Sequence, residues 1–447
     1  MYNFYYLLLF CFISLPVFAE DRTPAPSTLP NTIREMNAPG YWINRNPVPD
    51  KLIMTAPGVE IFNQHLRDDL KLSKDIFTIT QDFKTEGLVD IFNKVLSDFA
   101  SKGYYTASGS RDDAAFLDKA KLNMYLSGVV MGLQPRYGLV VRYTSQRILP
   151  TDEPLYELKD DIDFDQIQNS ALDIGTPVAI VHESADKQWF YVLTAFTDGW
   201  VKVNDIAIAD KKIASAFASS KTFAVVIKPK ADIFLNESMT RFDDYAQMGT
   251  RFPLKDNGHG AANIEVPTRD NQGNLVMMDG YMNSEDVHEG YLPYTPRHII
   301  RQAFIMLNQP YGWGGMYGQQ DCSRFLQMVF ATVGVALPRN SWEQAGSGNI
   351  VAEFNEKTVS VEKLGVLQNA LAGSVILPMK GHIMLYLGMV NSIPYAIHAT
   401  SGYKQKAGEK DISRSLNRVV ISDLSLGEGS GKGSLLRRLT KVVEIKS

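Results

Sequence analysis

Residues 311–345 read YGWGGMYGQQDCSRFLQMVFATVGVALPRNSWEQA and place Cys322 between a glycine-rich turn and an apolar run. The apolar side chains recur at helical spacing: Phe325, Leu326, Val329, Phe330 and Val333. This spacing predicts a helix that begins near Cys322 and stops before Gly334. Unpaired N–H groups and the dipole at a helix start favour a thiolate, so we expect a reactive cysteine with a lowered pKa. The alternative is a buried structural cysteine.

Two histidines follow in segments that read as strands. Residues 381–388, GHIMLYLG, predict a buried strand with His382 at its beginning, and residues 394–400, PYAIHAT, predict a second one. Alternation along the second strand places Ala396, His398 and Thr400 on one face. Strands so close in the chain usually pair as antiparallel neighbours, which would bring His382 and His398 together. A thiol, a base and a group that orients the base could then form one site.

These residues carry a resemblance to a known family. The combination of Tyr311-Gly-Trp-Gly-Gly, Asp321-Cys322-Ser323, Gly381-His382 and His398 resembles the catalytic core of NlpC/P60 cysteine peptidases. The resemblance implies a papain-like fold with Cys322 as nucleophile, His382 as base and His398 as the residue that orients it. The backbone N–H of Cys322 and the side chain of Tyr311 are candidates for stabilising the oxyanion.

The remaining chain suggests a multidomain α+β protein, because 447 residues exceed one ordinary core. A helical segment at 20–126 precedes short alternating strands at 127–215, which end on Asp198-Gly-Trp-Val and resemble a bacterial SH3-like barrel. A second set of strands at 216–290 suggests another such barrel. Thr295-Pro296 then predicts the first helix of a catalytic domain at 291–447.

The first residues, MYNFYYLLLFCFISLPVFAED, read as a secretory signal peptide at 1–19 that is cleaved after Ala19. A membrane anchor is the alternative, but the apolar run breaks at Pro16 and is short for a span. We therefore expect an exported protein, periplasmic, extracellular or associated with the cell wall, without stable membrane insertion. Cleavage would remove Cys11 and leave Cys322 as the only thiol.

A net charge of −4 and the lack of a dense Lys/Arg cluster argue against a nucleic-acid partner. Residues 427–434, GEGSGKGS, superficially suggest a phosphate loop, but the spacing is wrong and Gly433 follows Lys432. We interpret this segment as a link between strands. No cofactor or metal is expected, and a monomer is the default.

The domain order resembles that of γ-D-glutamyl–diamino acid endopeptidases, which implies a peptidoglycan stem peptide with a free L-Ala amine as substrate. Asp321 is then a candidate partner for that ammonium group, or only a helix N-cap. Ser323, Arg339 and Ser341 are candidates for contacting the D-Glu carboxylate, although Arg339 could instead brace its loop. Asn340 stands where many relatives carry Asp, so the arrangement around the amine can differ.

The sequence leaves open which side chains of the first SH3-like domain border the cleft and which diamino acid the substrate carries. The resemblance implies that the first SH3-like domain walls one end of the cleft, with Tyr191, Phe196 and Trp200 as candidate contacts. The sequence does not distinguish diaminopimelate from lysine at the third stem position. The alternative function is a wall-binding protein whose SH3-like domains hold peptidoglycan and whose cysteine site is vestigial.

Overall fold

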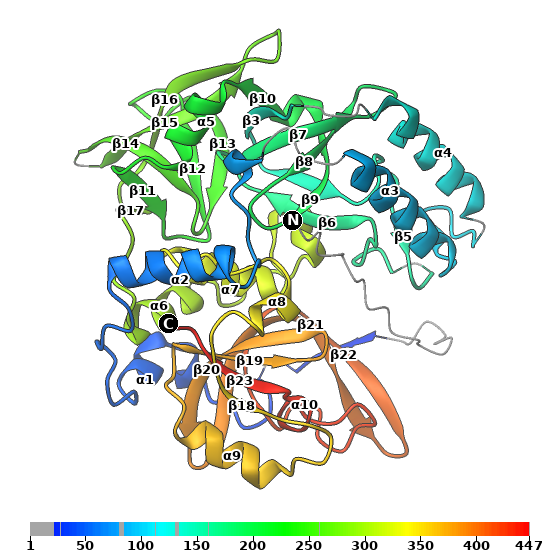
Figure 1. Cartoon of the computed structure of the whole chain (residues 1–447). Coiled ribbons are helices and arrows are strands. Elements are labelled where there is room, and N and C mark those ends of the chain that lie inside the picture. Colours follow the sequence, from blue (N-terminus) through cyan, green and yellow to red (C-terminus); the bar gives the residue numbers. More distant parts are fainter. Residues whose placement is uncertain are drawn as a thin grey trace.

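A computed structural model describes residues 22–26, 28–79, 85–111, 113–129, 134–159, 161–258 and 260–446. Within these residues the strands form three seven-stranded sheets and one two-stranded sheet. Figure 1 shows two of the large sheets side by side above the third, which belongs to the C-terminal region. The predicted signal peptide and Cys11 lie outside the described residues.

The C-terminal region is built on a sheet with the order β1-β22-β21-β20-β19-β23-β18. Helix α7 packs against β20 and β21 on one face, and α9 and α10 cover the other with an apolar layer of their own. The elements are α6 (Pro296–Ile305), η5 (Trp313–Gly318), α7 (Cys322–Ala331), α8 (Ser341–Gln344), β18 (Asn349–Glu353), α9 (Ser360–Gln368), β19 (Val375–Met379), β20 (His382–Val390), β21 (Ile393–Ala407), β22 (Lys410–Asp423), α10 (Leu435–Arg438) and β23 (Lys441–Glu444).

Local signals place the elements that carry the site. The hydroxyl of Thr295 accepts a hydrogen bond from the His298 N–H at 3.3 Å and caps α6, as the Thr-Pro pair predicts. The strands β20 and β21 are antiparallel neighbours, with Leu385 opposite Ile397. The helix that begins at Cys322 and the pairing of the two histidine strands are therefore as predicted.

The first SH3-like region is a sheet with the order β10-β3-β7-β8-β9-β4-β6. Its elements are β3 (Arg136–Val140), β4 (Thr144–Arg147), β5 (Leu155–Tyr156), β6 (Gln168–Leu172), β7 (Pro177–Glu183), β8 (Trp189–Leu193), β9 (Asp198–Lys202), η4 (Val203–Asp205), β10 (Ile206–Ala209) and the following α5 (Lys211–Ala218). The sheet has two ends and is not closed, so the structure shows an SH3-like sheet in place of the predicted barrel.

The second region is likewise an open sheet, with the order β13-β12-β16-β15-β14-β11-β17. Its strands are β11 (Phe223–Val226), β12 (Lys230–Phe234), β13 (Phe242–Gln247), β14 (Arg251–Asn257), β15 (Ala261–Arg269), β16 (Leu275–Asn283) and β17 (Val287–Glu289). Apolar side chains of both upper sheets join in one continuous core. The two regions therefore share one core and form a single packed unit.

The N-terminal segment contains β1 (Arg22–Pro24), η1 (Arg34–Asn37), α1 (Pro39–Ile43), α2 (Ala56–Asp68), η2 (Ile76–Thr78), α3 (Thr85–Ala100), β2 (Tyr105–Thr106), α4 (Ala114–Met124) and η3 (Leu126–Gly128). It does not form one helical domain. Trp42 and Phe62 belong to the core of the C-terminal region, whereas Leu88 and Phe92 belong to that of the SH3-like sheets. The segment thus ties the two parts of the molecule together.

Candidate active site

Cys322 is the first residue of α7, and Asp321 caps that helix by accepting the Arg324 N–H at 2.9 Å. The apolar side of α7 faces the sheet, so the cysteine is held where the helix start meets β20. Its side chain is buried, with 9% of the residue exposed, and the backbone N–H of Ile383 lies against the thiol. Ile383 directly follows His382, so the histidine is the chain neighbour of the residue that contacts the sulfur.

The two histidines form a chain with a serine. His382 Nε2 lies 2.8 Å from His398 Nδ1, and His398 Nε2 lies 3.0 Å from the Ser422 hydroxyl. His382 Nε2 must donate if its Nδ1 is to accept a proton from the thiol, so His398 Nδ1 accepts and His398 Nε2–H faces Ser422. The chain fixes both tautomers and leaves His382 Nδ1 for the chemistry.

Burial favours the neutral form of both ionisable partners. Burial, the largest cause, and the Asp321 carboxylate raise the pKa of the Cys322 thiol to about 12, although the Ile383 N–H and Arg339 act in the other direction. Burial lowers the pKa of His382 well below its ordinary value and that of His398 to about 3. The expected lowering of the Cys322 pKa is thus wrong, because desolvation of the sulfur outweighs the helix start.

An ion pair lies beneath the cysteine. Arg339 donates to both oxygens of Asp321, at 3.1 and 2.6 Å, and to the Ser323 hydroxyl at 2.9 Å. Its Nε donates to the Ser170 hydroxyl of β6 at 2.9 Å. Burial favours the neutral carboxyl, but the charge and hydrogen bonds of Arg339 prevail and lower the pKa of Asp321. The pair holds the start of α7 against the first SH3-like sheet.

The glycine-rich turn before Cys322 is shaped by the same sheet. Gly314 and Gly315 have positive φ values of 58° and 85°, and a Cβ on them would come within 2.7 Å of Gln168 and 2.6 Å of Ala171. The turn is also held by the Tyr143 hydroxyl, which donates to the Gly315 carbonyl at 2.6 Å. Glycine is needed here for both conformation and close approach.

Comparisons with known proteins agree with this geometry. Residues 308–417 match the NlpC/P60 family, and residues 154–202 match an SH3 domain of the SH3b1 type. The NlpC/P60 match lies within the C-terminal region and includes Cys322, His382 and His398. An NlpC/P60 endopeptidase structure from Photobacterium damselae subsp. piscicida covers 95% of this chain and 97% of its own, with a TM-score of 0.73 and 19% identity, which shows a shared fold.

Two curated proteins match parts of the chain. A γ-D-glutamyl-L-lysine dipeptidyl-peptidase from Bacillus cereus is 26% identical over 184 residues, 39% of this chain and 50% of the relative. A bifunctional muramidase/DL-endopeptidase from Bacillus subtilis is 30% identical over 92 residues, 20% of this chain and 26% of the relative. The chain thus spans half or less of the length of these curated relatives.

Two of the three candidate aromatic contacts, Tyr191 and Trp200, face away from the C-terminal region. Tyr191 and Trp200 pack on Phe92 of α3, with ring centroids 5.0 and 5.3 Å apart, so they face the N-terminal helices. Phe196 lines a cavity of about 230 Å³ that the SH3-like sheets share with α7. The contact with the region around the cysteine comes instead from Phe164, whose ring lies 6.2 Å from that of Tyr311.

Tyr311 is buried near Cys322 and Asp321. Burial is the largest cause that raises its pKa, and the neighbouring Cys322 and Asp321 raise it further. Its backbone N–H donates to the Asn417 carbonyl at 2.9 Å, which fixes the residue on the strand edge. Ser341 begins α8 and is half-buried, and Asn340 before it donates its N–H to Glu343 at 3.1 Å. Their roles toward substrate remain predictions.

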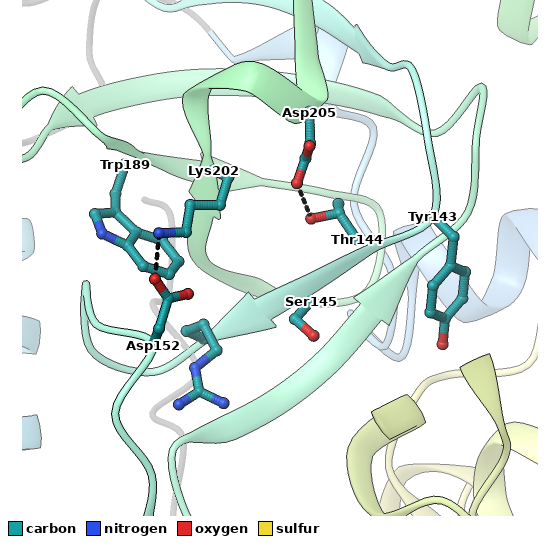
Figure 2. A pocket seen from close by; sticks show the side chains of 8 residues that line it. Tyr143, Thr144, Ser145, Asp152, Trp189, Lys202 and Asp205 are labelled. Carbon is teal, nitrogen blue, oxygen red and sulfur yellow. Dashed lines mark hydrogen bonds and ion pairs between the residues drawn. The ribbon is translucent and has the colours of Figure 1, made fainter. Parts of the chain in front are cut away.

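A cavity of the first SH3-like region is separate from the cysteine. It has a volume of about 380 Å³ and is lined by Tyr143, Thr144, Ser145, Arg147, Asp152, Trp189, Lys202 and Asp205. Figure 2 shows Lys202 paired with Asp152 beside Trp189, and Asp205 accepting from Thr144. Lys202 and Asp205 are thus engaged with neighbouring side chains of the same domain.

Two further features bear on the chemistry. Among the residues that the structure describes, no group of three His, Cys, Asp or Glu side chains is arranged to hold a metal ion. The same residues include no helix long and apolar enough to cross a membrane.

What the sequence did not reveal is the third member of the histidine chain, Ser422, because its position follows from the long-range pairing of β21 with β22.

Proposed function

We propose that this chain is a peptidoglycan hydrolase, a cysteine endopeptidase that cleaves the amide between γ-D-Glu and the diamino acid of stem peptides. The observation that carries the proposal is the arrangement of Cys322 against the first residues of β20, with His382 held by His398 at 2.8 Å. A buried structural cysteine has no need of a second histidine fixed behind the first. One curated relative is named a γ-D-glutamyl-L-lysine dipeptidyl-peptidase and the other a DL-endopeptidase, and these names support the choice of substrate.

In the proposed reaction, His382 Nδ1 takes the thiol proton as the sulfur attacks the amide carbon. Because burial favours the neutral form of both groups, proton transfer would accompany the attack rather than precede it. His398 stabilises the resulting imidazolium through the 2.8 Å hydrogen bond. His382 then protonates the departing amine, and the thioester left on Cys322 is hydrolysed by water that His382 activates.

The oxyanion would be held by the backbone N–H of Cys322 and by Tyr311. The acyl half of the substrate, L-Ala-γ-D-Glu, would lie on the side of Asp321, Ser323, Arg339 and Ser341. Both oxygens of Asp321 already accept hydrogen bonds from Arg339, so the ammonium group of L-Ala would meet a carboxylate whose charge is largely compensated. In this proposal Asp321 and Arg339 chiefly set the floor of the site.

The test is incubation of the reduced full chain with L-Ala-γ-D-Glu-diaminopimelate, with products identified by mass spectrometry. We expect release of L-Ala-D-Glu and free diaminopimelate, no turnover by Cys322→Ser, and a loss of about 10²–10³ in rate for Tyr311→Phe. Thermal unfolding of each variant controls for folding. Blocking the L-Ala amine tests the free terminus.

The outcomes separate the two function classes. Absence of cleavage by wild-type protein that still sediments with purified peptidoglycan would favour a wall-binding protein with a vestigial site. Turnover by Cys322→Ser would remove the sulfur from the mechanism. We also propose that the protein is exported and acts at the cell wall, which the cleavage of the first 19 residues in a secreting host would test.

A further inference from the structure

Three cationic side chains gather on the His382 side of the cysteine. Lys432 comes from the 427–434 link, Arg438 from α10 and Lys404 from β21. Lys432 and Arg438 both lower the pKa of His382, after burial and the neighbouring His398, so their charges reach the ring. Both lie beyond residues 308–417, the stretch matched by the family, and the match assigns them no role.

The cluster is held in place by the backbone. Leu439, next to Arg438, forms an isolated bridge with Met379, and Met379 lies opposite His382 in the pairing of β19 with β20. Lys363 of α9, only 2% exposed, donates its ammonium to the carbonyls of Arg437 at 2.7 Å and Leu439 at 2.9 Å. A buried lysine thus fixes the turn on either side of Arg438.

Two members of the cluster differ from Lys404, on which the Asp411 carboxylate acts. In the part of the chain that the structure describes, no ion pair involves Lys432 or Arg438. Lys432 is an exposed residue, yet desolvation, followed by Arg438 and Lys404, lowers the pKa of its ammonium. Asp411 acts on Lys404 and accepts the Gly431 N–H at 2.7 Å, so it braces the edge of the cluster.

The role of His382 in the reaction determines which part of a substrate lies next to Lys432 and Arg438. The leaving amine must come within hydrogen-bonding reach of His382 in order to take its proton. The residue that carries this amine therefore lies around His382, on the side away from the Asp321–Arg339 pair. In a stem peptide this leaving residue is the diamino acid, whose carboxylates are the natural partners of lysine and arginine.

We propose that Lys432 and Arg438, assisted by Lys404, bind the side-chain carboxylate of the leaving diamino acid and so select diaminopimelate over lysine. This inference rests on the proposed function, and it names the substrate class of the same site. Diaminopimelate carries a second carboxylate at the far end of its side chain, whereas lysine carries only an ammonium group there. The cluster would attract the former and repel the latter.

Binding of that carboxylate would also favour the chemistry. Like charges near an imidazole disfavour its protonated form, and an anion between them offsets the repulsion. With diaminopimelate bound, His382 would become a better base than it is in the free protein. In the empty site the cations disfavour the protonated form of His382, and the carboxylate of the correct substrate would offset this effect. Recognition of the substrate would thus be coupled to catalysis.

The experiment compares kcat/KM for three tripeptides: L-Ala-γ-D-Glu linked to meso-diaminopimelate, to L-Lys, and to diaminopimelate amidated at the far carboxyl group. We expect wild-type protein to prefer the first by at least about tenfold, the range of a charge-assisted hydrogen bond. Lys432→Met and Arg438→Met should each reduce this preference, chiefly through KM, and leave cleavage of the L-Lys peptide unchanged or faster. Lys441→Met is the matched control, because Lys441 is paired with Glu353 at 2.8 Å.

A binding measurement separates this inference from the proposed function. Calorimetry with free meso-diaminopimelate should show binding that is weakened about tenfold in Lys432→Met and unchanged in Lys441→Met. Such binding without cleavage of any tripeptide would retain the cationic site and overturn the hydrolase. Cleavage with equal efficiency on all three tripeptides, unchanged in both cluster variants, would overturn the cationic site and retain the hydrolase.

Discussion

Two charged clusters flank Cys322, and they are built in opposite ways. On one side Asp321 and Arg339 are both buried and hydrogen-bonded to each other, and the guanidinium also reaches Ser170 and Ser323. On the other side Lys432 and Arg438 lie together without an ion-pair partner among the described residues. The donors of Arg339 are used in hydrogen bonds within the protein, whereas those of Lys432 and Arg438 would be available to a ligand.

The difference shows how charge can serve structure and recognition in one site. Removing one member of a buried pair leaves the other charge desolvated and unsatisfied. Removing a cation from a cluster of like charges relieves repulsion and exposes nothing. The Asp321–Arg339 side should therefore govern stability, and the Lys432–Arg438 side should govern substrate choice.

The sulfur between the two clusters offers the largest expected effect. With a pKa raised to about 12, the thiolate fraction of Cys322 at neutral pH should be about 10³-fold below that of an ordinary cysteine. Iodoacetamide should therefore react slowly with the folded protein, and the rate should rise about tenfold per pH unit as long as the fold persists. The Cys322→Ser variant corrects for Cys11 in the full chain.

A different pH dependence of the alkylation rate would mean that His382 already ionises Cys322 in the free protein. A rate that levels off below pH 8 would mean that His382 holds the sulfur as a thiolate in the free protein. In that case His382→Ala should slow alkylation, whereas a neutral thiol would react at nearly the same rate in this variant. The comparison thus decides whether the ion pair exists before the substrate arrives.

The second prediction sets the clusters against each other with the same chemical change. Arg339→Met should lower the free energy of unfolding by about 3–5 kcal/mol, because it leaves the Asp321 carboxylate buried without its partner. Arg438→Met should change it by less than about 1 kcal/mol, since no ion pair is lost. Urea unfolding of both variants and of wild-type protein gives the two values.

Equal losses in both variants would contradict the distinction between a closed and an open cluster. Arg339→Lys serves as a further control, because lysine keeps the charge but cannot donate to Asp321, Ser323 and Ser170 at once. We expect it to recover only part of the loss. A full recovery would show that charge alone, without the hydrogen-bonding geometry, holds the start of α7.

The parts of this site that the sequence predicts are those set by local signals. Apolar spacing after Cys322 predicts α7, and the short interval between two apolar runs predicts the pairing of β20 with β21. The place of Asp321 as an N-cap follows from its position one residue before the helix. Each of these depends on neighbours within a few residues, which is the range over which a sequence pattern is informative.

The parts that it does not predict depend on contacts between distant segments. Ser422 reaches His398 through the long hairpin of β21 and β22, and the charge of Arg438 acts on His382 from a turn that Lys363 holds. Trp200 carries the same apolar pattern whether it faces a cleft or packs on Phe92. The raised pKa of Cys322 likewise comes from burial by the assembled fold, which a helix-start argument does not include.

The smallest effect concerns the one hydrogen bond by which the closed cluster reaches across to the SH3-like sheet. Ser170→Ala removes the acceptor of the Arg339 Nε–H and should cost about 1 kcal/mol in unfolding free energy. The neighbouring Asn169→Ala, whose amide bonds the Asp198 carbonyl within the first SH3-like region, is the matched control. If the sheet helps to position Arg339, Ser170→Ala should also lower kcat while the preference for diaminopimelate stays unchanged. A shift in that preference would mean that the two clusters are energetically coupled across the cysteine. The assignment of stability to one cluster and substrate choice to the other would then be wrong.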